Sequence, residues 1–271
     1  MALAWSVPEA IEIYRDAVWR REPENRVEDA RSAENFVEGV GFCSALTDCR
    51  RPGPSLYIAV CGRRDAFMPR NVQKDPESHL AWTIKDEVMR RGRVYYGKLL
   101  RNRSTFISRA LVPHFHAVSG VPEDKEEQSL SADARKVLRV LRIEWELASR
   151  DLREASRIKE RTSFNKAIDE LQKKFKVIPT DVIYKPIFTY VWSLVETRFQ
   201  DELQIKVSRE ESLKEIAGAY LKAAGMTNRG ELASVIGISR TDAGSANWSL
   251  VDDGAAVRLA PGVYQWRKAG D

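Results

Sequence analysis

The sequence predicts a mostly α-helical protein with small β-hairpins, built from three modules that share one order of elements. Apolar residues recur at helical spacing in several segments, and each run of helices is followed by two short extended runs with a turn between them. A length of 271 residues suits two average domains or three small ones. Helices followed by a small hairpin are typical of the winged helix-turn-helix. We therefore predict modules at residues 1–120, 131–200 and 207–271.

The third module has the clearest pattern. A helix is expected to begin at Ser208, which with Glu211 forms a capping box, and to end at Gly225. Thr227 and Ser239 are expected to cap the second and third helices. Two short strands then follow, at residues 256–260 and 263–267.

The second module repeats this order. Helices are expected from Ser131, over residues 149–155, and from residue 161, where Phe164 to Phe175 form an apolar stripe. The third of these helices would present Arg161, Asn165 and Lys166 outward, as base reading requires, although most soluble helices have such a polar face. A hairpin is expected at residues 176–178 and 187–194, with Pro179 and Pro186 at its tip.

The first module is expected to contain helices at residues 8–20, 30–40 and 79–91 and strands at residues 93–100 and 104–108. The turn Arg101-Asn102-Arg103 joins these strands. It would suit a wing that contacts a phosphate backbone or a minor groove, or it is an exposed turn that is simply basic. The polar stretch 120–130 is the expected linker to the second module.

Charge is concentrated in the first module. The chain has a net charge of +5, yet residues 50–109 hold fourteen basic and five acidic residues, a net charge of +9. A field of one sign attracts polyanions. The concentration favours nucleic acid as a partner, and the alternative is a solvated basic surface.

Several classes of protein are excluded or disfavoured. The apolar runs are too short for a membrane span, and the first six residues lack the basic and apolar regions of a secretory signal, so we expect a cytoplasmic protein. Three cysteines without a C-x-x-C pair argue against a disulfide framework or a zinc ribbon. No nucleotide-binding or hydrolase motif is present, and we expect neither a metal nor a cofactor.

One segment after the helix at residues 30–40 is unusual. Thr47 and Asp48 stand just before the basic turn Arg50-Arg51. A carboxylate there would orient a water or stabilise a developing oxocarbenium ion, with Thr47 beside it. The alternative is that Asp48 caps the turn or pairs with Arg50 or Arg51.

Three winged helices in tandem with a basic first module resemble the AlkZ-type family of bacterial DNA glycosylases, which includes YcaQ-like and azinomycin-resistance proteins. Residues 86–100 are similar to the leucine-rich helix, basic turn and aromatic strand of that family. Arg103-Ser104-Thr105-Phe106 resembles its Arg-Gly-Thr-Leu wing. The resemblance implies excision of alkylated bases from duplex DNA by a monofunctional glycosylase without a cofactor.

The sequence departs from that family at the catalytic motif. The family has Gln-x-Gln or Gln-x-Asp soon after a helix of its first module. Counted from Gly41, the corresponding residues here are 44–48, and they contain no glutamine. Gln73-Lys74-Asp75 has matching letters but lies in a polar stretch further on, and we interpret it as a loop coincidence.

Three hypotheses follow. The chain is a duplex-DNA-binding protein on a glycosylase scaffold, an active glycosylase with a diverged site at Asp48 and Thr47, or a transcription regulator, which would dimerise on a palindrome. We expect a monomer at the nucleoid whose partner is double-stranded DNA, including alkylated or crosslinked DNA. The expected DNA contacts are Arg50, Arg51, Arg90, Arg91, Arg93, Tyr95, Tyr96, Lys98, Arg101, Arg103, Arg161, Asn165 and Lys166.

Overall fold

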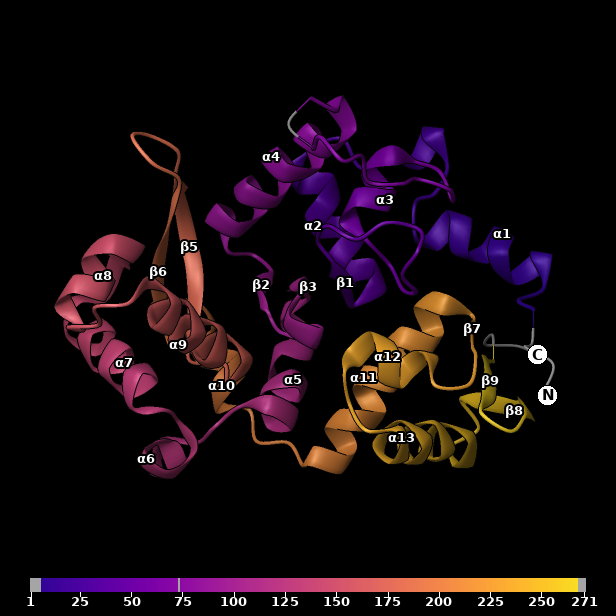
Figure 1. Cartoon of the computed structure of the whole chain (residues 1–271). Coiled ribbons are helices and arrows are strands. Elements are labelled where there is room, and N and C mark those ends of the chain that lie inside the picture. Colours follow the sequence, from indigo (N-terminus) through magenta and orange to yellow (C-terminus); the bar gives the residue numbers. More distant parts are fainter. Residues whose placement is uncertain (1–5, 73, 268–271) are drawn as a thin grey trace.

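The computed structural model describes residues 6–72 and 74–267 of the chain, which are mostly helical (Figure 1). The helices are α1 (Glu9–Val18), α2 (Ala30–Val40), α3 (Leu56–Cys61), α4 (Pro76–Arg91), α5 (Val112–Ser119), α6 (Glu126–Ser129), α7 (Ala132–Glu144), α8 (Ser149–Ala155), α9 (Arg161–Lys173), α10 (Glu196–Gln204), α11 (Arg209–Ala224), α12 (Glu231–Ile236) and α13 (Arg240–Asp252). Short 3-10 helices lie at Pro23–Asn25, Leu100–Asn102, Arg109–Leu111 and Glu123–Lys125. Among the described residues, none of these helices has both the length and the apolar character needed to cross a membrane.

Each module contributes one small antiparallel sheet. The strands are β1 (Phe42–Ser44), β2 (Tyr95–Lys98), β3 (Ser104–Ile107), β4 (Glu146–Ala148), β5 (Val177–Ile183), β6 (Thr189–Leu194), β7 (Met226–Thr227), β8 (Ala256–Ala260) and β9 (Val263–Trp266). The three sheets have the orders β1-β3-β2, β4-β6-β5 and β7-β9-β8. In every module a helix precedes the first strand, two helices follow it, and the last two strands form a hairpin. This winged-helix order confirms the predicted fold class.

Serine caps start the helices where the sequence predicts them. The hydroxyl oxygens of Ser131, Ser208 and Ser239 each accept a hydrogen bond from the backbone amide three residues ahead, at 2.9–3.2 Å. The prediction for Thr227 is wrong, because this residue lies in β7 opposite Tyr264 and α12 begins after Gly230 instead.

The hairpin of the second module is longer than predicted. Pro179 was expected at its tip, but it lies within β5, where the pairing register shifts between Pro179 and Asp181. A bulge accommodates proline, which has no amide hydrogen to donate to the ladder. The actual tip is therefore residues 184–188.

The expected linker at residues 120–130 is ordered and packed. It forms a 3-10 turn and α6. Glu126 is only 7% exposed, and its carboxylate pairs with Lys176 and, at 2.9 Å, with Arg142. A buried carboxylate needs such partners, so this segment is held against the second module rather than being a solvated spacer.

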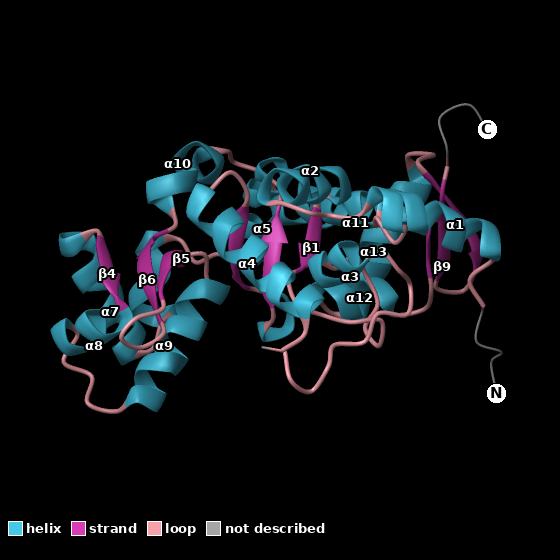
Figure 2. Ribbon diagram, turned by 90° about the horizontal axis from the view of Figure 1, so that it is seen from above, coloured by secondary structure: helices cyan, strands magenta, loops and turns pink. Residues whose placement is uncertain are grey.

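The buried hydrophobic side chains form two clusters, which do not correspond to the three predicted modules. The larger cluster includes residues of the first and third modules together with several of the second, such as Phe175 and Phe199, whereas a smaller cluster belongs to the second module alone. Figures 1 and 2 show the second module at one end of the molecule, with the first module beside it. The module boundaries at residues 120, 131, 200 and 207 stay predictions, but the first and third modules share one core.

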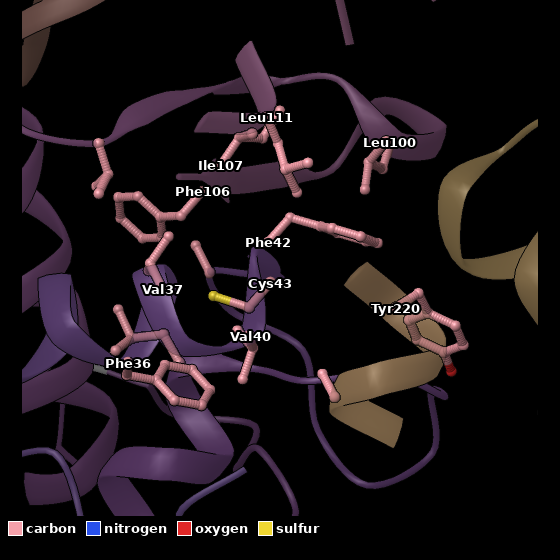
Figure 3. Close-up of a cluster of buried hydrophobic side chains, with 14 of the residues drawn as sticks. Phe36, Val37, Val40, Phe42, Cys43, Leu100, Phe106, Ile107, Leu111 and Tyr220 are labelled. Carbon is pink, nitrogen blue, oxygen red and sulfur yellow. The ribbon is translucent and has the colours of Figure 1, made fainter. Parts of the chain in front are cut away.

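Phe42 of β1 lies at the centre of this shared core. Its ring meets Phe115 of α5 edge-on at 5.3 Å and Tyr220 of α11 at 6.2 Å between ring centroids (Figure 3). Gly41 precedes it with a φ of +79°, and a Cβ atom there would lie 2.9 Å from Leu111 Cδ1 and 3.1 Å from Ala219 Cβ. Glycine is therefore required at this junction for both conformation and space.

We expect Gly41→Ala to lower the free energy of unfolding by about 1–3 kcal/mol, because alanine is strained at this φ and collides with the third module. Gly39→Ala is the matched control: its Cβ atom would meet nothing within 4 Å inside α2, and alanine is favoured over glycine in a helix by roughly 0.5–1 kcal/mol. Urea denaturation measures both. Equal stabilities of the two variants would contradict this account of the junction.

Candidate nucleic-acid interface

A groove of about 980 Å³ lies between the second and first modules. Its walls come from α8, α9 and the β5–β6 hairpin, with β2 and the start of β3 on the side of the first module. The side chains that line it include basic, aromatic and acidic residues: Lys98, Arg150, Arg153, Arg161 and Lys185; Tyr96, Phe164, Phe188, Tyr190 and Trp192; and Asp151 and Asp169. Cations interleaved with aromatic rings suit a nucleic-acid strand, whose phosphates and bases need both.

The stem of the hairpin is fastened to α4 by a buried polar cluster. Lys85 is 1% exposed, pairs with Asp86 and donates to the Tyr190 hydroxyl at 3.3 Å. Its ammonium group also lies 4.6 Å from the centre of the Trp82 ring. Tyr184 donates a hydrogen bond to Asp86 from the hairpin side. In the order of a winged helix, α4 is the last helix before the hairpin, the position of the DNA-reading helix. In the first module this helix is therefore partly covered by the hairpin of the second module.

Several predicted phosphate contacts are already paired with carboxylates. Arg90 binds Asp181 at 2.5 Å and the Val182 carbonyl at 3.1 Å. Arg91 and Arg93 lie 2.7 Å and 3.6 Å from the carboxylate of Glu34, which is 5% exposed.

Removing both Arg91 and Arg93 from Glu34 would leave a buried carboxylate without these charged partners. Arg90, Arg91 and Arg93 thus hold carboxylates in this structure, and their contact with phosphates stays a prediction. Lys98 is also paired, with Asp169 at 3.0 Å, but it remains at the edge of the groove.

Of the two tyrosines of β2, only Tyr96 lines the groove. Tyr95 is fully buried against Phe175 and Phe199, at 4.9 and 5.5 Å between ring centroids, so it has no face for a base and that prediction is wrong. Burial raises the pKa of its hydroxyl. Tyr96 is 6% exposed and contributes to the groove wall.

Three other arginines form a cluster at the junction of the first and third modules. Arg51 and Arg101 are exposed and Arg103 is partly exposed, and within residues 6–72 and 74–267 no ion pair joins any of them to a carboxylate. Burial, together with the positive charges of Arg51 and Arg101, lowers the pKa of Arg103. We call Arg51, Arg101 and Arg103 the arginine cluster. Unbalanced positive charge of this kind favours a bound anion.

The arginine cluster and the groove are neighbours. Arg103 precedes Ser104, which lines the groove. On the other side, a Cβ atom at Gly237 after α12 would lie 3.2 Å from Arg101 Cγ, so the turn of the first module reaches the third. Cationic side chains therefore continue from the groove, along the first module, to α12.

Of the predicted contacts on α9, Arg161 and Asn165 line the groove, whereas Lys166 faces a smaller depression formed with Glu170 and Lys173. Sequence reasoning missed Arg150, Arg153 and Lys185, which also line the groove. A spacing of three residues between Arg150 and Arg153 on an expected helix was the available signal.

Asp48 has the structural role that the sequence left as the alternative. Its carboxylate accepts hydrogen bonds from the Arg50 side chain, at 3.0 Å from Nε, and from the backbone amides of Arg50 and Met68 at 3.2 and 3.1 Å. The Arg50 side chain is the main cause that lowers the pKa of Asp48 to about 2. The Thr47 carbonyl accepts from the Ser55 hydroxyl at 2.6 Å.

Neither Asp48 nor Thr47 lines the groove. With its oxygens occupied, Asp48 is poorly placed to activate a water, so we no longer assign it a catalytic role. Arg50 is held by this carboxylate but its side chain is exposed, so its contact with DNA stays a prediction. Of the Gln73-Lys74-Asp75 stretch, Gln73 lies outside the described residues, and Asp75 caps α4 by accepting from the Ser78 amide at 2.7 Å.

Comparisons with known proteins place these features in context. The model of the AlkZ-related family matches residues 27–237. The DNA glycosylase AlkZ of Streptomyces sahachiroi is a similar solved structure, with 12% identity, a TM-score of 0.54, and coverage of 93% of this chain and 69% of that chain. At this identity the likeness shows a shared fold.

A second solved structure, the DIP2311 protein of Corynebacterium diphtheriae, has 16% identity and covers 78% of this chain and 39% of that chain. Its TM-score of 0.22 is too low for an argument. No curated protein matches the sequence significantly.

We expect Asp48→Asn to lower the free energy of unfolding by about 1–3 kcal/mol near neutral pH, because the Arg50 side chain and the amides of Arg50 and Met68 lose a buried, charged acceptor. Since the folded-state pKa of Asp48 is depressed to about 2, its contribution is fully present above the ordinary carboxyl pKa and disappears as the pH falls through about 2. The stability difference between wild type and variant should therefore shrink on acidification. Asp65→Asn, at an exposed position nearby, is the control, and a difference independent of pH would contradict this role.

Proposed function

The chain belongs to the AlkZ-related family, and from that premise we propose that it binds duplex DNA along the groove and the arginine cluster, as a DNA-glycosylase-like protein of DNA repair. The observation that carries the proposal is the continuity of unpaired arginines with a groove of cations and aromatic rings. Neutralising phosphates and releasing their counterions is the main source of affinity for duplex DNA. Such a protein would act at the nucleoid, as a monomer.

We further propose that the catalytic glutamine motif of the family is replaced here. Counted from Gly41 after α2, the motif would fall at residues 44–48, at the end of β1 and just behind it. Phe42, Cys43 and Ala45 are at most 1% exposed, and burial raises the pKa of the Cys43 thiol. Within residues 44–48 themselves there is no glutamine, and the one carboxylate, Asp48, is occupied by Arg50 and by two backbone amides. The segment therefore has no free acid or amide side chain to position a water for hydrolysis.

An active glycosylase is the second candidate, because α9 supplies an acid and an amide to the groove. Asp169 and Gln172 both line it, and the Gln172 side chain accepts a hydrogen bond from the Lys98 amide at 2.9 Å. In hydrolysis, water adds to the sugar C1′ as the base departs with the electrons of the glycosidic bond. A carboxylate such as Asp169 would accept the proton of that water and stabilise the oxocarbenium ion.

We expect the affinity for a duplex of random sequence to fall steeply with salt, with a slope of about −0.9 in the log–log plot for each phosphate contact. The double variant Arg101→Ala with Arg103→Ala should bind all sequences more weakly and have a shallower slope. Fluorescence anisotropy across a salt series measures both quantities.

The matched control for charge is Arg139→Ala with Lys206→Ala, which removes two exposed cations that do not line the groove. A wild-type slope near zero would refute DNA binding. An unchanged slope in the Arg101 and Arg103 variant alone would remove the arginine cluster from the interface.

Catalysis is tested with a duplex that contains N7-methylguanine. Under the primary proposal the protein binds this duplex without releasing the base, as judged by strand cleavage at abasic sites. Release that is lost in Asp169→Asn, with binding retained, would establish the second candidate in its place.

A further inference from the structure

The tip of the β5–β6 hairpin is apolar and exposed. Ile183, Tyr184, Ile187 and Phe188 have exposed fractions of 41%, 51%, 75% and 41%. Figure 1 shows this tip projecting past α8 and α9. Four exposed large hydrophobic side chains on one hairpin form a patch that is unfavourable in water unless a partner covers it.

The tip is exposed, yet its stem is held in place. Arg90 of α4 binds Asp181 and the Val182 carbonyl, and Asp86 accepts a hydrogen bond from Tyr184. From the tip inward, neighbouring rings of Tyr184, Phe188, Tyr190 and Trp192 contact one another at 5.2–5.6 Å between centroids. The hairpin is thus a stiff support that presents its apolar end in one orientation.

The surroundings of the tip select its partner. Lys185 and Ile187 lie in the same short turn, and both line the groove together with Arg153 and Arg161. A hydrophobic protein partner would not need cations beside the apolar patch, whereas DNA offers phosphates on either side of its stacked bases. Proteins that bend DNA often insert apolar side chains between base pairs from the minor groove, next to basic residues.

We infer that the hairpin tip is a wedge that enters the minor groove and unstacks one base step, with Ile187 and Phe188 as the inserting side chains. This inference rests on the proposed binding of duplex DNA. The cations of the groove hold the flanking phosphates, and the fastened stem directs the wedge. Kinking at this step would widen the separation between bases and make a damaged, weakly stacked base easier to displace.

The test is a duplex of random sequence with 2-aminopurine at its centre and a donor–acceptor pair at its ends. Wild-type protein should raise the 2-aminopurine fluorescence, which reports unstacking, and increase energy transfer, which reports bending. The double variant Ile187→Ala with Phe188→Ala should lose both signals and bind about tenfold more weakly. Its salt slope should stay unchanged, because no phosphate contact is removed.

The matched control is Ile143→Ala with Trp145→Ala. It also removes two exposed hydrophobic side chains, which are 70% and 67% exposed and lie at the end of α7, outside the groove. It should keep both signals. Ile187→Ala alone, at the most exposed of the four positions, guards against a folding defect in the double variant. Thermal unfolding of every variant verifies the fold.

The outcomes separate the two proposals. Wild-type protein that binds the duplex without unstacking or bending it would overturn the wedge and leave the proposed function standing. Signals retained in the Ile187 and Phe188 variant would also overturn the wedge. Wild-type protein that does not bind the duplex at all would refute both.

Discussion

The burial of Phe42 between the first and third modules is the contact on which the arrangement of the molecule depends. Its ring joins Phe115 and Tyr220 in one core, and Gly41 leaves room for Leu111 and for Ala219 of α11 to approach the backbone before β1 closely. Because protein interiors are densely packed, two modules that share a core have little freedom to change their relative orientation. This orientation is what places Arg101 of the first module against the end of α12.

The first and second modules are joined by the apolar contact of Tyr95 with Phe175 and Phe199 and, in addition, by a buried polar cluster. A buried lysine and aspartate, Lys85 and Asp86, meet two tyrosine hydroxyls and several aromatic rings. Buried ion pairs contribute little net stability, but their geometry is specific, and removal of one partner is costly. The cluster therefore sets where the hairpin stands on α4 more than it adds to the stability of the fold. In doing so it positions the β5–β6 hairpin, which lines one side of the groove.

The basic side chains near these two junctions differ in whether a carboxylate neutralises them. Arg90 of α4 is paired with Asp181 and links the first module to the second, whereas Arg91 and Arg93 are paired with Glu34 inside the first module. Arginines on the turn between β2 and β3 have no such partner among the described residues and form the arginine cluster. A net charge of +9 over residues 50–109 thus has two functions, of which only one is available to a phosphate backbone.

The sequence by itself determined the elements and their order, because helix periodicity, serine caps and turn residues act over a few neighbouring positions. Ser131, Ser208 and Ser239 begin their helices as predicted, and the order of helices and hairpins identified the winged-helix fold. Tertiary structure decided which of the predicted DNA-contacting side chains are exposed and free of a carboxylate partner. Tyr95 is buried by residues about a hundred positions away, and Arg90 is paired across 91 positions. Burial and charge pairing depend on how modules pack, and no local pattern encodes the distance between residues that are remote in the chain.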